Sequence, residues 1–464
     1  MFRTLLAATL LGLLLSGCMH RPELADSCSA LFSQLHDASA GVRDGQYHRL
    51  PGFAGLRSER SLALLGHSAE SSAQRRLWLQ RLSELDAQAS AIEIAQLPTT
   101  TRQFWQQAEQ QKALASCRAR QIEQLASEPQ AFAQALQAAQ VPDDYQGWAR
   151  ALGLYPLLKP VYRRGIDTWQ QQAAQLSAPV DGPQWLGYRP LAQPAATTLA
   201  ALPSDSLGLP QADSEQLQAL FARHAPWLKV AQASRHDRLG SPEYRATGQR
   251  ELNLTQPVLY QHSGWSRIQG RWHLQLIYQF WFSQRPKTHA LDLFGGELDG
   301  LLWRVTLDAQ GNALLYDSIH PCGCWHAFYL PADSPWQFRQ APGEEARQAR
   351  RLDLTGDQAA TLWLGAGDHS LLWVDDRRSP YPAVLYQGAS LDQLRQLPHP
   401  QGLRSLYRAD GLVPGTQRLE RWLLWPSGVR SPGAMRQWGR HATAFIGRAH
   451  FDDPLLLERY FQTP

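Results

Sequence analysis

The spacing of hydrophobic residues changes once along this chain, from the period of a helix to the period of a strand. In the first part they recur at three- and four-residue steps, as at Trp78, Leu82 and Leu85. In the second part they alternate, and the clearest run is Arg271–Phe282, in which every second residue from Trp272 onward is apolar. Steps of three and four place side chains on one face of a helix, whereas steps of two place them on one face of a strand. We therefore expect an α+β protein with its helices first and its strands second.

A change of composition marks the boundary between the two parts. Residues 177–213 are rich in proline, alanine, serine and glycine, which is typical of a linker or a long wrapping segment. A chain of 464 residues is also longer than one ordinary domain. We expect a helical bundle over residues 18–176, a linker over 177–213 and an antiparallel β-sandwich-like domain over 214–464, because the last part contains many short strands separated by turns.

Charge and motifs exclude several classes of function. The formal charge is +4, with 45 basic and 41 acidic residues and no long basic run, so nucleic acid is not expected as the main partner. A hydrophobic fraction of 44% with 19% charged residues argues against general disorder and against a protein with many membrane spans. The sequence contains no G-x-S-x-G, H-E-x-x-H, Walker or G-x-G-x-x-G motif.

The first seventeen residues are typical of a secretory signal. Arg3 is followed by an apolar stretch over Leu5–Leu15, which is shorter than the ~20 residues that span a bilayer. The end of this segment, Leu15-Ser-Gly-Cys18, resembles the lipobox of bacterial lipoproteins. The resemblance implies cleavage after residue 17, acyl chains on Cys18 and attachment to a membrane through them. Met19, in place of an aspartate, implies by the same resemblance an outer-membrane protein that faces the periplasm or the cell surface.

Four further cysteines remain if Cys18 carries lipid. An exported protein folds in an oxidising compartment, and four cysteines permit three pairings. Cys28 and Cys117 both lie in the helical part, and we expect a disulfide between them that joins two helices. Cys322 and Cys324 lie together in the strand-rich part.

The strand-rich part contains a candidate metal-binding segment, His320-Pro-Cys-Gly-Cys-Trp-His326. Imidazole and thiolate are the ligands that zinc prefers, and the candidates are His320, Cys322, Cys324 and His326. An extended segment would hold the two histidines ~20 Å apart, so a shared ion requires a turn within it. The alternatives are a disulfide between Cys322 and Cys324, or two cysteines that simply pack in a turn.

An acidic set precedes this segment. Asp292, Glu297 and Asp299 lie in a glycine-containing stretch, and carboxylate oxygens are the ligands that calcium and magnesium prefer. Polar turn residues between two strands are the alternative. His369, in Gly367-Asp-His369, follows a later strand at a point where a loop could carry a site.

Five segments of the strand-rich part follow one another in a characteristic order. They are His224-Ala-Pro-Trp-Leu228, Tyr278-Gln-Phe-Trp-Phe282, Gly296–Trp303, Leu314–His320 and Gly365–His369. Over about residues 216–390 this order resembles the necrosis-inducing-protein-like and vacuolar-sorting-related β-sandwich domains.

That resemblance implies a cation site. In the necrosis-inducing branch, acidic and histidine side chains bind a divalent cation, and the positions that match here are Asp299, His320 and His369, with Glu297 beside them. The G-H-R-H-D-W-E signature of the cytolytic members is absent, so toxin activity is not implied. In the helical part, Pro51–Arg57 resembles a pattern of an uncharacterised proteobacterial family and implies no function.

Three functions fit these observations. The first is a lipid-anchored envelope protein that acts as a binding or interaction module, with a protein or glycan partner and a zinc or calcium ion in its strand-rich part. The second is a metal-dependent hydrolase that uses His320, Cys322, Cys324, His326 and the nearby carboxylates. The third is an envelope structural or assembly factor. The first is favoured because no complete catalytic motif is present, and likeness of fold does not decide function.

Overall fold

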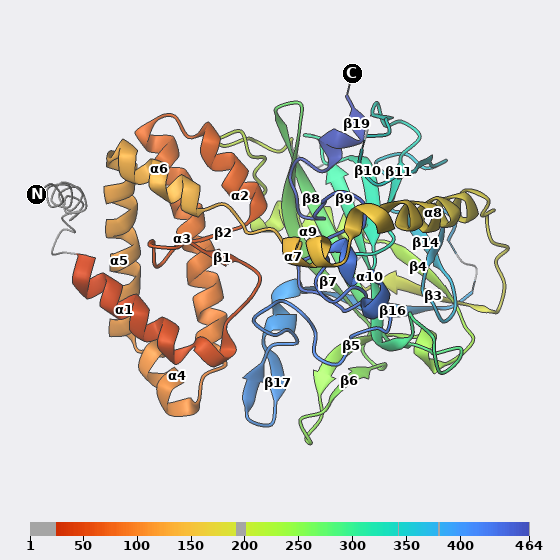
Figure 1. Ribbon diagram of the computed structural model, residues 1–464, viewed down its shortest axis with the longest axis horizontal. Coiled ribbons are helices and arrows are strands. Elements are labelled where there is room, and N and C mark those ends of the chain that lie inside the picture. Colours follow the sequence, from red (N-terminus) through yellow and green to blue (C-terminus); the bar gives the residue numbers. More distant parts are fainter. Residues whose placement is uncertain (1–24, 192–200, 342, 379–380, 464) are drawn as a thin grey trace, which may run out of the picture.

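The computed structural model describes residues 25–191, 201–341, 343–378 and 381–463. The signal segment and Cys18 lie outside these residues. The described chain is an α+β protein in which a group of helices lies beside one large curled sheet (Figure 1). Among the described residues, no helix combines the length and the hydrophobicity needed to cross a bilayer.

The helical half is built on three helices that pack together, α1 (Ala25–Ala38), α3 (Ser72–Ala95) and α5 (Ala108–Ser127). The shorter helices α2 (Arg60–Leu65), α4 (Thr99–Gln106) and α6 (Pro129–Ala138) complete it. The Ser71 hydroxyl and the Gln74 side chain form a capping box at the start of α3, which fixes where that helix begins. Trp78 and Leu82 are fully buried, so the expected apolar stripe faces the core.

The expected disulfide joins two of these helices. Cys28 of α1 is bonded to Cys117 of α5, with their Cα atoms 5.6 Å apart. The prediction made from the cysteine positions is therefore confirmed.

The sheet has thirteen strands and mixes parallel with antiparallel pairs. Its main path runs β13-β11-β10-β9-β8-β7-β16-β3-β4-β14-β15, with β5 and β6 attached beside β8. The strands are β3 (Trp185–Pro190), β4 (Trp227–Ala231), β5 (Leu239–Tyr244), β6 (Arg250–Asn253), β7 (Val258–Ile268), β8 (Arg271–Arg285), β9 (Gly296–Leu307), β10 (Ala313–Ile319), β11 (Ala327–Leu330), β13 (Ala349–Arg351), β14 (Thr361–Leu364), β15 (Leu371–Asp375) and β16 (Ala383–Ser390).

This arrangement differs from the antiparallel sandwich expected for residues 214–464. Strands β7–β10 form an antiparallel series, but β16 pairs in parallel with both β3 and β7, and β14 pairs in parallel with β4. Alternation of apolar residues reports which face of a strand is buried and carries no information about the neighbouring strand. The strands were therefore predictable, whereas their partners were not.

The sheet curls around its own core. Tyr329 of β11 and Val374 of β15 belong to one buried cluster, although these strands lie near opposite ends of the sheet. Helix α9 (Ser214–His224) packs into the same cluster, where the Tyr278 hydroxyl donates to the carbonyl of Phe221 at 2.8 Å. The alternating residues of β8 from Leu274 to Phe282 face this core, as their period predicted.

Residues 177–213 do more than link two domains. They contain β3, which pairs with β4 and with β16 inside the sheet and buries Tyr188. The flanking prolines and alanines dominate the composition and hide the short strand. Residues 192–200 lie outside the described part of the chain.

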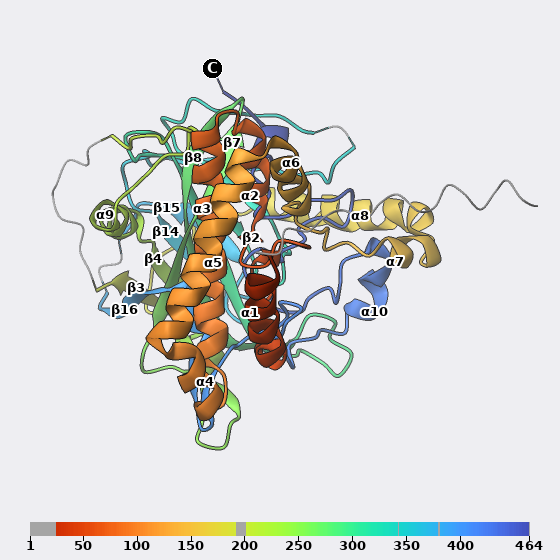
Figure 2. The same cartoon turned by 90° about the vertical axis from the view of Figure 1, so that its left-hand side faces the viewer.

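Two helices of the expected helical domain lie against the sheet half instead. They are α7 (Gly147–Leu152) and α8 (Tyr155–Ala174), and they stand apart from α3 and α5 in Figure 2. The Gln170 amide donates to the carbonyl of Ala346 at 2.5 Å, and Arg350 donates to the carbonyl of Ala173 at 2.9 Å. Helix α8 is thereby fixed across the sheet half, where it can form the wall of a site.

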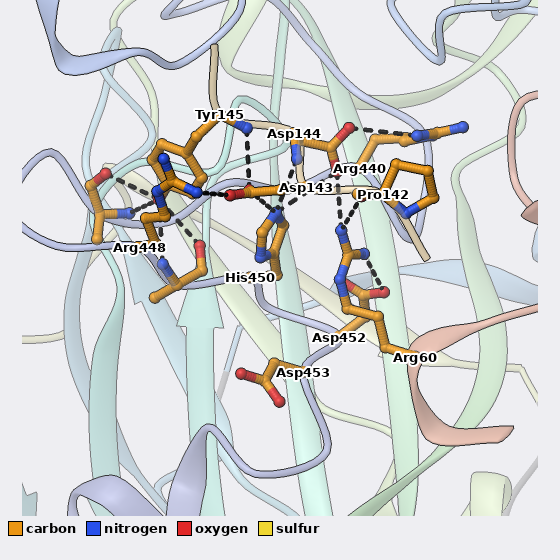
Figure 3. A network of polar contacts seen from close by, with 12 residues as sticks. Arg60, Pro142, Asp143, Asp144, Tyr145, Arg440, Arg448, His450, Asp452 and Asp453 are labelled. Atoms are coloured by element: carbon orange, nitrogen blue, oxygen red, sulfur yellow. Dashed lines mark hydrogen bonds and ion pairs between the residues drawn. The ribbon is translucent and has the colours of Figure 1, made fainter. Parts of the chain in front are cut away.

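A polar network fixes the helical half to the C-terminal segment (Figure 3). Arg60 of α2 pairs with Asp452 at 2.8 Å and with Asp144 at 3.1 Å, and Asp144 also pairs with Arg440 at 3.2 Å. These side chains are mostly buried, so the pairs are shielded from salt.

Candidate functional site

A cavity of about 330 Å³ lies on the inner face of the curled sheet, between the C-terminal end of α8 and strands β9–β11. Its wall carries aromatic rings from three elements: Trp169 of α8, Trp325 of the turn after β10, and Tyr329 of β11. The rings of Trp169 and Trp325 are 5.0 Å apart. The polar side chains on the wall include Arg285 and His320. A mostly apolar cavity with a few polar groups is the usual form of a small-molecule site.

His320 is the outer member of a buried chain of four alternating side chains. Its Nδ1 lies 3.3 Å from Oδ1 of Asp299, whose other oxygen lies 2.9 Å from Nδ1 of His369. Nε2 of His369 lies 3.3 Å from Oδ1 of Asp237. All four side chains are buried. Asp299 thus holds Nδ1 of His320, and His320 also lines the cavity.

The inner end of this chain is held in a tight loop. His369 has a left-handed backbone, with φ of +50°, and its ring stacks on Phe282 at 3.9 Å. Asp237 accepts hydrogen bonds from the backbone N–H of Gly367 at 2.6 Å and of Ser234 at 2.7 Å. A non-glycine residue in this region costs about 1–3 kcal/mol and persists only where its surroundings fix it. Here the two aspartates and Phe282 do so.

The ionisable side chains of this group shift one another's pKa values. Burial works against charge on His369, but its contacts with Asp237 and Asp299 outweigh burial and raise the pKa of the imidazole. Burial likewise opposes ionisation of Asp299, yet hydrogen bonds from His320 and His369 hold the pKa of this carboxyl well below its usual range. The pKa of Asp237 is lowered in the same way, with burial opposed by the hydrogen bonds from His369 and the loop. The two carboxylates thus favour the charged form of His369, and His369 favours the charged form of each carboxylate.

The segment after β10 forms the turn that the sequence required. The N–H of Gly323 donates to the carbonyl of His320 at 2.8 Å, and the N–H of His320 donates to the carbonyl of Cys324 at 3.0 Å. Cys322 and Cys324 are free thiols. A hydrogen bond from Cys324 lowers the pKa of the Cys322 thiol to about 6, and the same bond raises the pKa of Cys324.

His326 belongs to a different cluster. Its Nε2 donates to Oδ2 of Asp317 at 2.8 Å, and Asp317 is also held by the guanidinium of Arg304 through bonds of 2.8 and 2.5 Å. Burial lowers the pKa of His326 to about 3, so its ring is neutral at physiological pH. Its Nδ1 has no hydrogen-bond partner in the described part of the chain.

The structure therefore divides the seven expected metal ligands. Asp299, His320 and His369 come together around one carboxylate, whereas His326 pairs with Asp317. Glu297 faces outward and pairs with Arg250 at 2.7 Å. Asp292, from the same acidic stretch, accepts hydrogen bonds from its own loop. Within the described ranges, no three His, Cys, Asp or Glu side chains are arranged so that they could hold a metal ion.

Several residues of the site carried no signal in the sequence. Asp237 lies far from His369 along the chain, and Trp169 belongs to a helix assigned to the other domain. The high tryptophan content, 17 residues, was the one relevant hint, since tryptophan often lines ligand sites.

A second cavity of about 460 Å³ lies between the two halves, lined among others by Glu59, Trp265 and His262. Burial raises the pKa of Glu59 to about 7, and the Ser61 hydroxyl donates to its Oε1 at 2.6 Å. The first cavity is the stronger candidate because the chain of four side chains ends at its wall.

Comparisons with known proteins assign no family. No family model matches the chain, and no curated protein matches it. One solved structure, titled "Toxin fold for microbial attack and plant defense", is aligned over 42% of this chain and 81% of its own chain, at 16% identity and a TM-score of 0.24. A TM-score this low supports no inference about fold or function.

Proposed function

We propose that this protein is a lipid-anchored component of the bacterial cell envelope that binds a small ligand in the cavity under α8. The anchor would be Cys18, in the outer membrane, with the described chain facing the periplasm or the cell surface. The lipobox-like end at Leu15–Cys18 supports this location. The disulfide between Cys28 and Cys117 also supports it, because such bonds persist mainly in exported proteins.

The observation that carries ligand binding is the position of His320. Its ring is oriented by Asp299 and lies on the wall of a mostly apolar cavity that also carries Trp169 and Trp325. A histidine oriented in this way offers one defined ring nitrogen to a ligand.

The lining favours a ligand with a flat apolar part and an acidic or hydrogen-bonding group. Trp169 and Trp325 supply ring faces for the apolar part. Arg285 and His320 supply donors for the polar group, and charge-assisted hydrogen bonds of this type are among the strongest. Asp368, which is also on the wall, is engaged with the Ser370 hydroxyl at 3.0 Å.

The test uses indole-3-acetate and its uncharged amide as probes. Both are titrated by calorimetry into the chain that begins at Met19, which retains every described residue. We expect indole-3-acetate to bind more tightly than the amide. We expect His320→Gln and Trp325→Ala each to weaken binding by at least about tenfold, the usual result of losing a hydrogen bond to a charged group or a stacked ring.

His67→Gln is the matched control, because His67 is exposed on the helical half. It should bind indole-3-acetate as the unaltered chain does. If neither probe binds, the ligand class is wrong. If binding survives both His320→Gln and Trp325→Ala, the probe occupies another site and the assignment of this cavity fails.

A further inference from the structure

Eight large apolar side chains are exposed together on α7, α8, α10 (Arg421–Leu424) and the residues that adjoin them. Trp148, Leu157 and Trp422 are 60%, 72% and 66% exposed. The tryptophan–leucine patch consists of Trp148, Leu152, Leu154, Leu157, Val161, Trp422, Leu423 and Trp425. Soluble proteins rarely expose so many neighbouring apolar side chains unless the surface meets a partner.

Contacts between these helices bring the patch together. The rings of Trp148 and Trp425 stack at 6.4 Å, and the Tyr162 hydroxyl donates to the carbonyl of Leu423 at 3.3 Å. Figures 1 and 2 agree that α7, α8 and α10 lie side by side, and Figure 2 shows them projecting beyond the sheet. The patch therefore lies on an outward ridge.

The exposed face of α8 is regular. Leu157 and Val161 are four residues apart, which places them on one face of the helix, and the exposed Leu154 directly precedes its first residue. Other side chains of the helix are tied to the body of the protein, as by the Tyr155 hydroxyl, which donates to the carbonyl of Phe445 at 3.0 Å. The apolar stripe thus points away from the fold that holds the helix.

Charge around the patch has one dominant sign. The three helices carry five basic residues and one acidic residue, Asp167. Arg163 and Arg164 are exposed on the same helix, and the guanidinium of Arg421 lies 4.7 Å from the ring of Trp422. The whole chain is nearly balanced, at +4 from 86 charged residues, so this excess is local. The excess of basic residues on these helices is complementary to an anionic surface.

We propose that the tryptophan–leucine patch docks on the headgroup region of an anionic lipid membrane. Tryptophan prefers the boundary between lipid and water, and helices with an apolar face and basic neighbours lie in that boundary. A projecting ridge presents its side chains to a flat lipid surface. The contact would be independent of the acyl chains on Cys18 and would set how the protein faces the membrane.

The experiment removes the lipid anchor and asks whether the patch alone binds. The chain beginning at Met19, which lacks Cys18, is mixed with vesicles of phosphatidylethanolamine and phosphatidylglycerol and separated by flotation. We expect it to float with these vesicles, with a shift of tryptophan fluorescence to shorter wavelength. The variant Trp148→Ser/Leu157→Ser/Trp422→Ser should bind at least about tenfold more weakly. Arg163→Glu/Arg164→Glu should weaken binding to these vesicles and leave binding to phosphatidylcholine vesicles unchanged.

The matched control is Phe104→Ser/Val384→Ser/Leu385→Ser, which removes exposed apolar side chains from other surfaces and should leave flotation unchanged. The proposal is overturned if the unaltered chain does not float, or if the patch variant floats equally well. It is also overturned if the unaltered chain is a dimer that only the patch variant makes monomeric, since the patch would then be covered by a second copy. Circular dichroism of each variant checks that it is folded.

Discussion

Nδ1 of His369 lies 2.9 Å from Oδ2 of Asp299, and both side chains are buried. Removing one member of a buried pair of ionisable groups leaves the other without its partner, which typically costs about 3–5 kcal/mol when both are charged. We therefore expect Asp299→Asn to lower the free energy of unfolding by about that amount. Denaturation in urea, followed by circular dichroism, measures it. Glu297→Gln is the control on the same strand, since Glu297 is mostly exposed, and it should unfold like the native chain. Equal stability of the two variants would show that the contact between His369 and Asp299 contributes nothing to the free energy of unfolding.

His326 makes stability depend on pH. Burial lowers its pKa to about 3 in the folded chain, whereas an unfolded histidine titrates near its ordinary value of about 6.5. Between pH ~3 and ~6.5 the unfolded state therefore binds more protons than the folded state. The neutral ring makes its full contribution to the free energy of unfolding above pH ~6.5, and this contribution is lost as the pH falls toward ~3. Each unit of difference between the two pKa values changes the free energy of unfolding by about 1.4 kcal/mol.

His326→Asn should accordingly flatten the fall in stability between these pH values, because an asparagine amide can donate to Asp317 without titrating. Thermal melts at a series of pH values give the slope. His67→Asn, at an exposed histidine, should leave the slope as it is in the native chain. A slope that is unchanged in His326→Asn would mean that the acid sensitivity lies in other groups.

The disulfide of the helical half closes a loop across 89 positions of the sequence. A loop of this length gives ~4–5 kcal/mol of stabilisation in the chain-entropy account. We expect Cys28→Ser/Cys117→Ser to melt at a lower temperature, with a loss of about that size at most. Peptide mapping without reductant should find Cys28 linked to Cys117, and Cys322 and Cys324 alkylated as free thiols once the chain is unfolded. Alkylation of Cys28 or Cys117 would contradict the pairing.

Metal ions should have little effect on stability. Among the described residues, no three His, Cys, Asp or Glu side chains are arranged so that they could hold a metal ion together. A ligand stabilises a fold only in proportion to its affinity for the folded state. We therefore expect no change in Tm on treatment with a chelator or on addition of zinc or calcium. A rise in Tm with zinc that is abolished in Cys322→Ser would reinstate a metal site at the turn.

The sequence predicted features that depend on neighbours along the chain. The period of three to four predicted α3, and the alternation predicted which face of β8 is buried. These features rest on local geometry, which a few consecutive residues determine.

Features that depend on distant residues were missed. The parallel pairing of β16 with β3 joins segments from the expected linker and the strand-rich part, and no local pattern encodes it. The site illustrates the same limit. Asp299, His320 and His369 were candidates from the sequence, whereas Asp237 was not. Asp237 lies near His369 because β4 and β14 are parallel neighbours, so the segments that follow these two strands lie at the same edge of the sheet. The other expected ligands were chosen by residue type, and type alone does not decide whether a neighbour such as Asp317 has already engaged the side chain.

The position of β16 between β7 and β3 has a consequence for the order in which the chain can mature. A protein is synthesised from its first residue onward, so β3 and β7 both emerge long before β16. Until residues 383–390 arrive, the sheet exists only as two pieces with unpaired edges, and such edges pair readily with other chains. The helical half, whose disulfide lies within residues 28–117, can be complete much earlier. A chain interrupted before residue 383 would therefore have a folded helical half and a sheet in two pieces. We expect such a chain to aggregate more readily than the complete one, because β16 is the strand that joins the two pieces.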